Sequence, residues 1–179
     1  MIHPGPRNLI TDVPGIRVGN AEDARALTGV TVIIPDERAV AAADVRGGGP
    51  GTRETDALAP GRLVERVDAV VLSGGSAFGL AAADAAMGWL AARGRGFPVA
   101  GQVVPIVPAA VLYDLGVGSA SVRPDMAAGY AACENANSAL MSGPYGAGTG
   151  ATVGKAGGPE RAGRGGFGTA SVKLPGGVI

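Results

Sequence analysis

Few residues of this chain combine a reactive side chain with a local pattern that would position it. Tyr113 follows an apolar run, and Lys155 stands in a segment of small residues where long side chains are scarce. A tyrosine in that setting is either a core residue with a hydrogen-bonded hydroxyl or a donor to a developing oxyanion. The lysine is either a solvated surface residue or a cation aimed into a cleft, where it would stabilise an anionic intermediate. These two residues are the candidates for a catalytic site.

Other familiar catalytic motifs do not fit the sequence. Residues 74–79 resemble a nucleophile elbow, but Phe78 occupies the position where that motif needs its last glycine. A Ser–His–Asp triad requires a histidine, and the single one, His3, lies in a Pro- and Gly-rich N-terminal tail. Residues 148–156 resemble a phosphate-binding loop, but Thr149 stands where that loop needs a glycine. One His, one Cys and no clustered carboxylates predict neither a metal site nor a cofactor.

The composition is typical of a globular domain. The 179 residues are 46% apolar and 17% charged and include 32 glycines, so tight turns and close backbone contacts should be frequent. Lys+Arg and Asp+Glu balance at 15 each, which argues against a nucleic-acid partner. Cys133 is the single cysteine and the first residues lack a signal-peptide pattern, so a cytoplasmic location is expected. The longest weakly charged stretch, 77–92, is too short to span a membrane.

The elements that must position these residues alternate between strands and helices, which predicts an α/β fold in one domain. Strands are expected at 16–18, 28–34, 39–45, 68–72, 103–107, 169–173 and 178–179. Residues 35–38 should join the second and third of these strands as a hairpin. Helices are expected at about 77–93, with Ser76 as N-cap and Gly94 at the end, and from about 124 to 141.

Six segments, taken together, resemble a known family. They are Ile10–Gly19, Arg46–Asp56, Val71–Leu80, Val104–Asp114, Gly146–Lys155 and Gly165–Ser171. In this order they are similar to the N-terminal half of the L-aminopeptidase / D-Ala-esterase-amidase family, whose relatives include β-peptidyl aminopeptidases and nylon-oligomer hydrolases. The match covers nearly all of residues 1–179, and blocks of this length are far more specific than a lone glycine motif.

The resemblance implies an autoprocessed N-terminal-nucleophile hydrolase. Members are made as one precursor that cuts itself, and the new N-terminal Ser or Thr is the nucleophile. Its own α-amine acts as base, so no histidine, metal or cofactor is required. The α and β chains stay associated in an αββα sandwich, and the assembled enzymes are usually oligomers. The implied reaction is hydrolysis of amide or ester bonds in short peptides or amino-acid amides.

The same resemblance carries over to single residues. Tyr113 matches the family's active-site tyrosine, which helps to stabilise the oxyanion, and Lys155 matches an active-site lysine of the nylon-oligomer branch. The nucleophile and its β-chain neighbours would fall beyond Ile179. The chain is therefore expected to be most of an α chain, an incomplete sandwich that is inactive without its β chain. An acyl-transferase of ornithine acetyltransferase-like architecture and a non-catalytic, truncated binding module are the alternatives.

Overall fold

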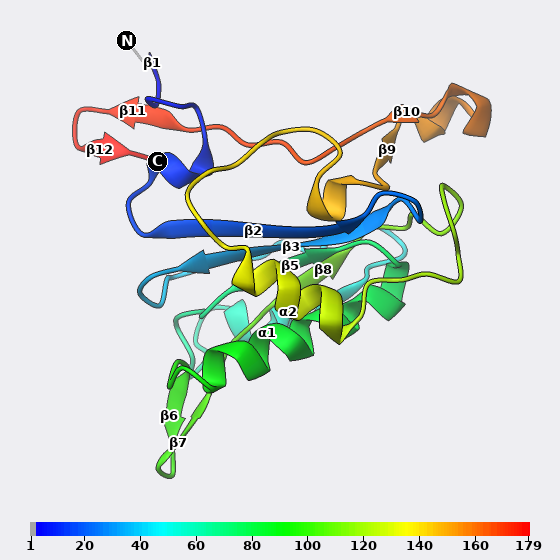
Figure 1. The fold of residues 1–179 in the computed structure, drawn as a ribbon. Coiled ribbons are helices and arrows are strands. Elements are labelled where there is room, and N and C mark those ends of the chain that lie inside the picture. Colours follow the sequence, from blue (N-terminus) through cyan, green and yellow to red (C-terminus); the bar gives the residue numbers. More distant parts are fainter. Residues whose placement is uncertain (1–2) are drawn as a thin grey trace.

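A five-stranded mixed sheet organises the chain, and the computed structural model describes residues 3–179 around it. In sheet order the strands are β2 (Ile16–Asp23), β3 (Thr28–Pro35), β5 (Val70–Ser73), β8 (Ala109–Val111) and β4 (Thr52–Arg53). The β5–β8 pair is parallel and the other pairs are antiparallel. Helices α1 (Ala82–Ala91) and α2 (Met126–Glu134) lie side by side on one face of this sheet (Figure 1). The α/β class predicted from the sequence is confirmed.

Alternate residues of the two central strands build the core under the helices. Val30, Val32 and Ile34 of β3 are fully buried, and Val71 of β5 joins them. The helices contribute small residues together with Trp89 and Leu90, of which Leu90 is fully buried. Because side chains alternate between the faces of a strand, these residues share the helix-covered face. Burial of β-branched side chains therefore fixes the central strands and the layer that covers them.

Two glycines allow close approach, one between the two helices and one between α2 and the sheet. A Cβ on Gly129 of α2 would lie 2.3 Å from the carbonyl oxygen of Ala82 in α1. A Cβ on Gly19 of β2 would lie 1.9 Å from the carbonyl oxygen of Ala132. Backbone atoms cannot move aside as a flexible side chain can, so only glycine allows these approaches. The high glycine content thus serves close packing of layers as well as turns.

Short elements complete the fold. A small sheet contains β1 (His3–Pro4), β11 (Val172–Leu174) and β12 (Gly177–Val178). One two-stranded ribbon pairs β6 (Phe97–Val99) with β7 (Gln102–Val104). Another pairs β9 (Thr152–Val153) with β10 (Gly163–Arg164). The β6–β7 hairpin projects beyond the helices, and the C-terminal segment crosses the sheet face opposite the helices (Figure 1). Within residues 3–179, no helix is both long and apolar enough to cross a membrane.

The predicted hairpin between 28–34 and 39–45 is wrong. Strand β3 is already paired on both edges. On one edge Thr28 lies opposite Asp23 and Pro35 opposite Ile16 of β2. On the other edge Val30 lies opposite Ser73 and Ile33 opposite Val70 of β5. Residues 39–45 therefore have no free edge of β3 to join. Ala39 forms an isolated bridge to Val67, and the exposed segment that follows makes no strand. The hairpin partner of β3 is β2, whose predicted range of 16–18 was too short.

The predicted ends of both helices also differ from the structure. Gly75 and Ser76 have positive φ angles of 78° and 54°. Gly75, and not the predicted Ser76, is the N-cap, and it begins a 3-10 turn, Ser76–Ala81. The α-helix begins only at Ala82. The first helix ends at Ala91 instead of the predicted Arg93, and Gly94, with φ of 68°, lies three residues beyond that end. Helix α2 stops at Glu134 because Asn137 pairs its backbone with Val18 of β2.

Asp12 joins the N-terminal turn to the C-terminal strand. Its carboxylate accepts hydrogen bonds from the Ser171 hydroxyl at 2.7 Å, the Leu9 amide at 3.2 Å, and the Arg7 amide and Nε at 3.0 Å each. Burial alone would raise the pKa of Asp12. The hydrogen bonds from Ser171, Leu9 and Arg7 outweigh it and hold the pKa well below its usual range. The folded state therefore strongly favours the charged carboxylate.

This carboxylate should make the fold sensitive to acid. In the unfolded chain an aspartate binds a proton below about pH 4, whereas Asp12 in the folded chain resists protonation until much lower pH. Its stabilising contribution is present at neutral pH and is lost as the pH falls below about 4. Thermal unfolding measured from pH 7 to pH 3 should show a shallower acid loss in Asp12→Asn than in wild type. The exposed control Glu65→Gln should keep the wild-type slope, and equal slopes for all three proteins would contradict this role.

Cys133 is a small residue of the core. It is buried in α2, and burial raises the pKa of its thiol to about 12; Arg93 partly offsets this increase and Glu134 adds to it. Since the thiolate is the reactive form, native Cys133 should react very slowly with a disulfide reagent at pH 8 and rapidly in denaturing urea. Rapid labelling of the native protein would show that α2 opens or that the thiol is exposed.

Candidate active site

Tyr113 and Lys155 line one pocket. The pocket has a volume of about 520 Å³. Its lining residues are Tyr113, Gly116, Val117, Thr152, Lys155, Pro159, Ala162, Gly163 and Arg164. Tyr113 comes from the segment after β8, whereas Lys155 follows β9, so the fold brings together two segments that are far apart in the sequence. The structure thus places both predicted site residues at one location, and their chemical roles remain predictions.

Tyr113 is not a core residue. It follows the parallel strand β8, and 67% of its side chain is exposed. Exposure leaves the phenol available to a ligand in the pocket, which excludes the alternative of a buried, structurally hydrogen-bonded tyrosine. The Gly74–Ser76 turn lies close by, because the Ser76 amide donates to the carbonyl of Leu112 at 3.0 Å. The backbone next to Tyr113 is therefore held by a second element.

Asp114, directly after Tyr113, anchors this backbone from inside the protein. Its side chain is 3% exposed and accepts hydrogen bonds from the Thr28 hydroxyl at 2.6 Å and the Gly75 amide at 2.7 Å. A Cβ on Gly150 would lie 2.6 Å from the Cβ of Asp114, so the loop before β9 packs directly on the same residue. One buried carboxylate thus joins β3, the Gly-rich turn and the loop that leads to Lys155. Asp114 was not among the residues predicted from the sequence; its position next to Tyr113, after an apolar run, was the available signal.

Lys155 lines the pocket without being buried in it. Its Nζ donates to the hydroxyl of Thr152 at 2.9 Å, and Gly154, with φ of 81°, turns the chain just before it. Lys155 is exposed, so its charge is solvated as well as directed at the pocket. Arg164 of β10, which the sequence analysis missed, lines the same pocket and donates from Nη2 to the carbonyl of Thr149 at 2.9 Å.

His3, Thr169 and Ser171 are not among the residues that line this pocket. His3 pairs with Lys173 in the small sheet. Thr169 accepts a hydrogen bond from the Ile10 amide, and Ser171 donates to Asp12, so both hydroxyls hold the N-terminal turn. Among residues 3–179, no three His, Cys, Asp or Glu side chains are grouped to hold a metal ion.

The chain and its fold match known proteins. The model of peptidase family S58 matches residues 8–178. An uncharacterized aminopeptidase of Mycobacterium leprae is 48% identical over 182 residues, covering 96% of this chain and 50% of the relative. A 6-aminohexanoate-oligomer endohydrolase of Kocuria sp. is 37% identical over 155 residues, covering 84% of this chain and 40% of the relative.

A solved structure shows the same fold. The L-aminopeptidase D-Ala-esterase/amidase of Ochrobactrum anthropi, a variant of the Ntn hydrolase fold, matches with a TM-score of 0.64 at 22% identity, over 83% of this chain and 45% of that chain. The fold is thus α/β and of the N-terminal-nucleophile hydrolase type. The chain belongs to peptidase family S58, a family of aminopeptidases and amidohydrolases, as its six segments predict. It spans about half the length of the curated relatives that it matches, 50% of the Mycobacterium leprae protein.

Proposed function

We propose that this chain is most of the α chain of an autoprocessed hydrolase that cleaves amide or ester bonds in short peptides or amino-acid amides. The observation that carries the proposal is that Tyr113 and Lys155 line one pocket in a chain of family S58. The half-length coverage of the relatives supports a second part that brings the nucleophile. The partner is then a β chain beginning with Ser or Thr, and αβ units assemble further into oligomers in the cytoplasm.

In this proposal the pocket residues stabilise charge, and the β chain supplies the attack. The N-terminal hydroxyl of the β chain adds to the scissile carbonyl, and its own α-amine accepts the proton. The exposed phenol of Tyr113 donates a hydrogen bond to the oxyanion that forms. The ammonium group of Lys155, held by Thr152, adds positive charge beside that oxygen. Neither a histidine nor a metal is needed for these steps.

Intact mass and N-terminal sequencing of the full-length gene product test the proposal. The expected result is two co-purifying chains, of which the second begins with Ser or Thr, together with release of the N-terminal residue from short peptides. Changing that Ser or Thr to Ala should leave an uncut precursor. A single uncut species without hydrolysis would support a non-catalytic binding module. Transfer of acetyl groups between amino acids, without peptide cleavage, would support an acyl-transferase.

A further inference from the structure

The charge of the Tyr113 pocket is one-sided. The charged residues that line it within residues 3–179 are both cations, Lys155 and Arg164. The other lining residues, apart from Tyr113 and Thr152, are glycines or apolar side chains. Glu160 belongs to the neighbouring turn, Pro159–Arg161, but does not line the pocket. An anionic group that enters the pocket would therefore meet two positive charges and no competing carboxylate from its lining.

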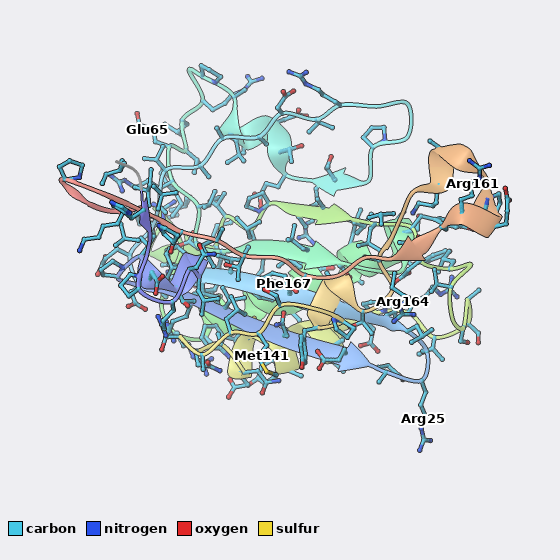
Figure 2. The ribbon with its side chains drawn as sticks, turned by 90° about the horizontal axis from the view of Figure 1, so that it is seen from above. Arg25, Glu65, Met141, Arg161, Arg164 and Phe167 are labelled. Atoms are coloured by element: carbon cyan, nitrogen blue, oxygen red, sulfur yellow. The ribbon has the colours of Figure 1, made fainter. Side chains whose placement is uncertain are left out.

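The register of the β9–β10 ribbon explains why both cations face the pocket. Arg164 lies directly opposite Thr152 in this antiparallel pair, so the two side chains leave the same face of the ribbon. The ammonium of Lys155 reaches the hydroxyl of that same Thr152 at 2.9 Å. Both cations are therefore on one face, next to Tyr113. In Figure 2, Arg164 lies nearer the sheet, whereas Arg161 lies at the outer end of the segment.

Arg164 is held in place and still has hydrogen-bond donors to offer. Within residues 3–179 its one hydrogen bond runs from Nη2 to the carbonyl of Thr149, at 2.9 Å. A guanidinium carries five N–H donors in a planar fork that matches a carboxylate. A pocket of about 520 Å³ with mostly small and apolar walls fits a short chain ending in such a group. The pocket thus has the chemistry of a site for a small organic acid.

We propose that Arg164 binds the free carboxylate at the far end of a short substrate, on the leaving-group side of the bond that is cut, while Lys155 stays at the reacting end. This inference rests on the proposed function, because Tyr113 marks the reacting end of the pocket. A substrate whose carbonyl lies at Tyr113 extends along the β9–β10 ribbon and places its terminal carboxylate at Arg164. The enzyme then selects dipeptide-like acids over the corresponding amides, and Arg164 determines that preference.

Matched substrates and matched variants test this preference in the full-length, processed protein. The substrates are one dipeptide with a free carboxylate and the same dipeptide as its C-terminal amide. Arg164→Gln should raise KM for the acid about 10-fold or more, as expected when a charged hydrogen bond is lost. KM for the amide and kcat for both substrates should stay within about 2-fold of wild type. Arg161→Gln, on the same segment but outside the pocket lining, should change neither substrate.

The outcomes separate this inference from the proposed function. In one outcome the protein hydrolyses both substrates, while Arg164→Gln changes KM equally for both, or for neither. This result would overturn the carboxylate site and leave the proposed hydrolase function standing. If the protein cleaves neither substrate, the proposed function fails, and binding of N-acetylglycine and N-acetylglycinamide by titration calorimetry decides. The site would be supported if wild type binds the acid more tightly than the amide, if Arg164→Gln abolishes this difference, and if Arg161→Gln keeps it. Equal binding of acid and amide by wild type would refute it.

Discussion

Replacing Tyr113 with phenylalanine should lower kcat of the processed full-length enzyme by about 100-fold, the usual cost of removing one oxyanion donor. The substitution deletes only the phenolic hydroxyl, and the ring is 67% exposed, so the fold should lose little stability. KM should change little, because the hydroxyl contacts the oxygen mainly once it carries negative charge. Steady-state kinetics with a short peptide substrate, together with urea unfolding, measure both effects.

Tyr130→Phe provides the matched control for this substitution. Tyr130 is also an exposed tyrosine, at 50%, but it lies on α2 and does not line the Tyr113 pocket. It should keep wild-type kcat. Equal kcat values for Tyr113→Phe, Tyr130→Phe and wild type would show that Tyr113 does not donate to the oxyanion. A fall in stability that parallels the fall in kcat would instead point to a structural role.

Gly129→Ala should destabilise the protein by about 1–3 kcal/mol, the usual cost of forcing extra atoms into a packed interior. The added methyl group would lie 2.3 Å from the carbonyl oxygen and 2.9 Å from the Cα of Ala82. Both are backbone atoms of α1, so the two helices must separate before the methyl group fits. Separation would also loosen the contacts of Ala132 and Cys133 with the core. Urea unfolding of the full-length protein gives the change in the free energy of unfolding.

Gly88→Ala is the matched control in the other helix. Gly88 lies in α1, is exposed, and has no atom within 4 Å of the position where a Cβ would stand. Alanine there should stabilise the protein by about 0.5–1 kcal/mol, because glycine has the poorer helix propensity. The same Gly-to-Ala change is thus expected to lower the free energy of unfolding at position 129 and to raise it at position 88. A Gly129→Ala variant as stable as wild type would contradict the close contact between α1 and α2, and destabilisation by Gly88→Ala would contradict the open space at Gly88.

The parts of the fold that were predictable from the sequence are those whose residues carry a local signal. Thr28–Ile34 is rich in β-branched residues and forms β3 almost as predicted. Gly94 follows the last residue of the first helix, Ala91, within three positions, and its positive φ suits glycine. The predicted 39–45 strand does not form because both edges of its expected partner, β3, are already paired. Strands of two residues, such as β9 and β10, have almost no local signal, since pairing between distant segments creates them.

The candidate site was predictable to the same extent. Tyr113 and Lys155 were found through their surroundings in the sequence and through resemblance, and they share a pocket. The hydrogen bond between Asp114 and Thr28 spans 86 residues, so no local pattern could reveal it. Arg164 was missed because its place opposite Thr152 depends on the register of a ribbon inside a glycine-rich segment. Charge at a pocket is a property of the folded chain, and the sequence shows only the overall balance.

The hydrogen bonds of Asp12 and its neighbours also bear on the order in which parts of the chain fold. The Ser171–Asp12 and Thr169–Ile10 hydrogen bonds each join residues 159 positions apart. At synthesis rates of about 5–20 residues per second, the N-terminal turn waits on the order of ten seconds for these partners. The segment that leaves the ribosome first is thus among the last to find its native contacts. Such long loop closures slow folding. The N-terminal turn completes these hydrogen bonds only when residues 169–171 reach it.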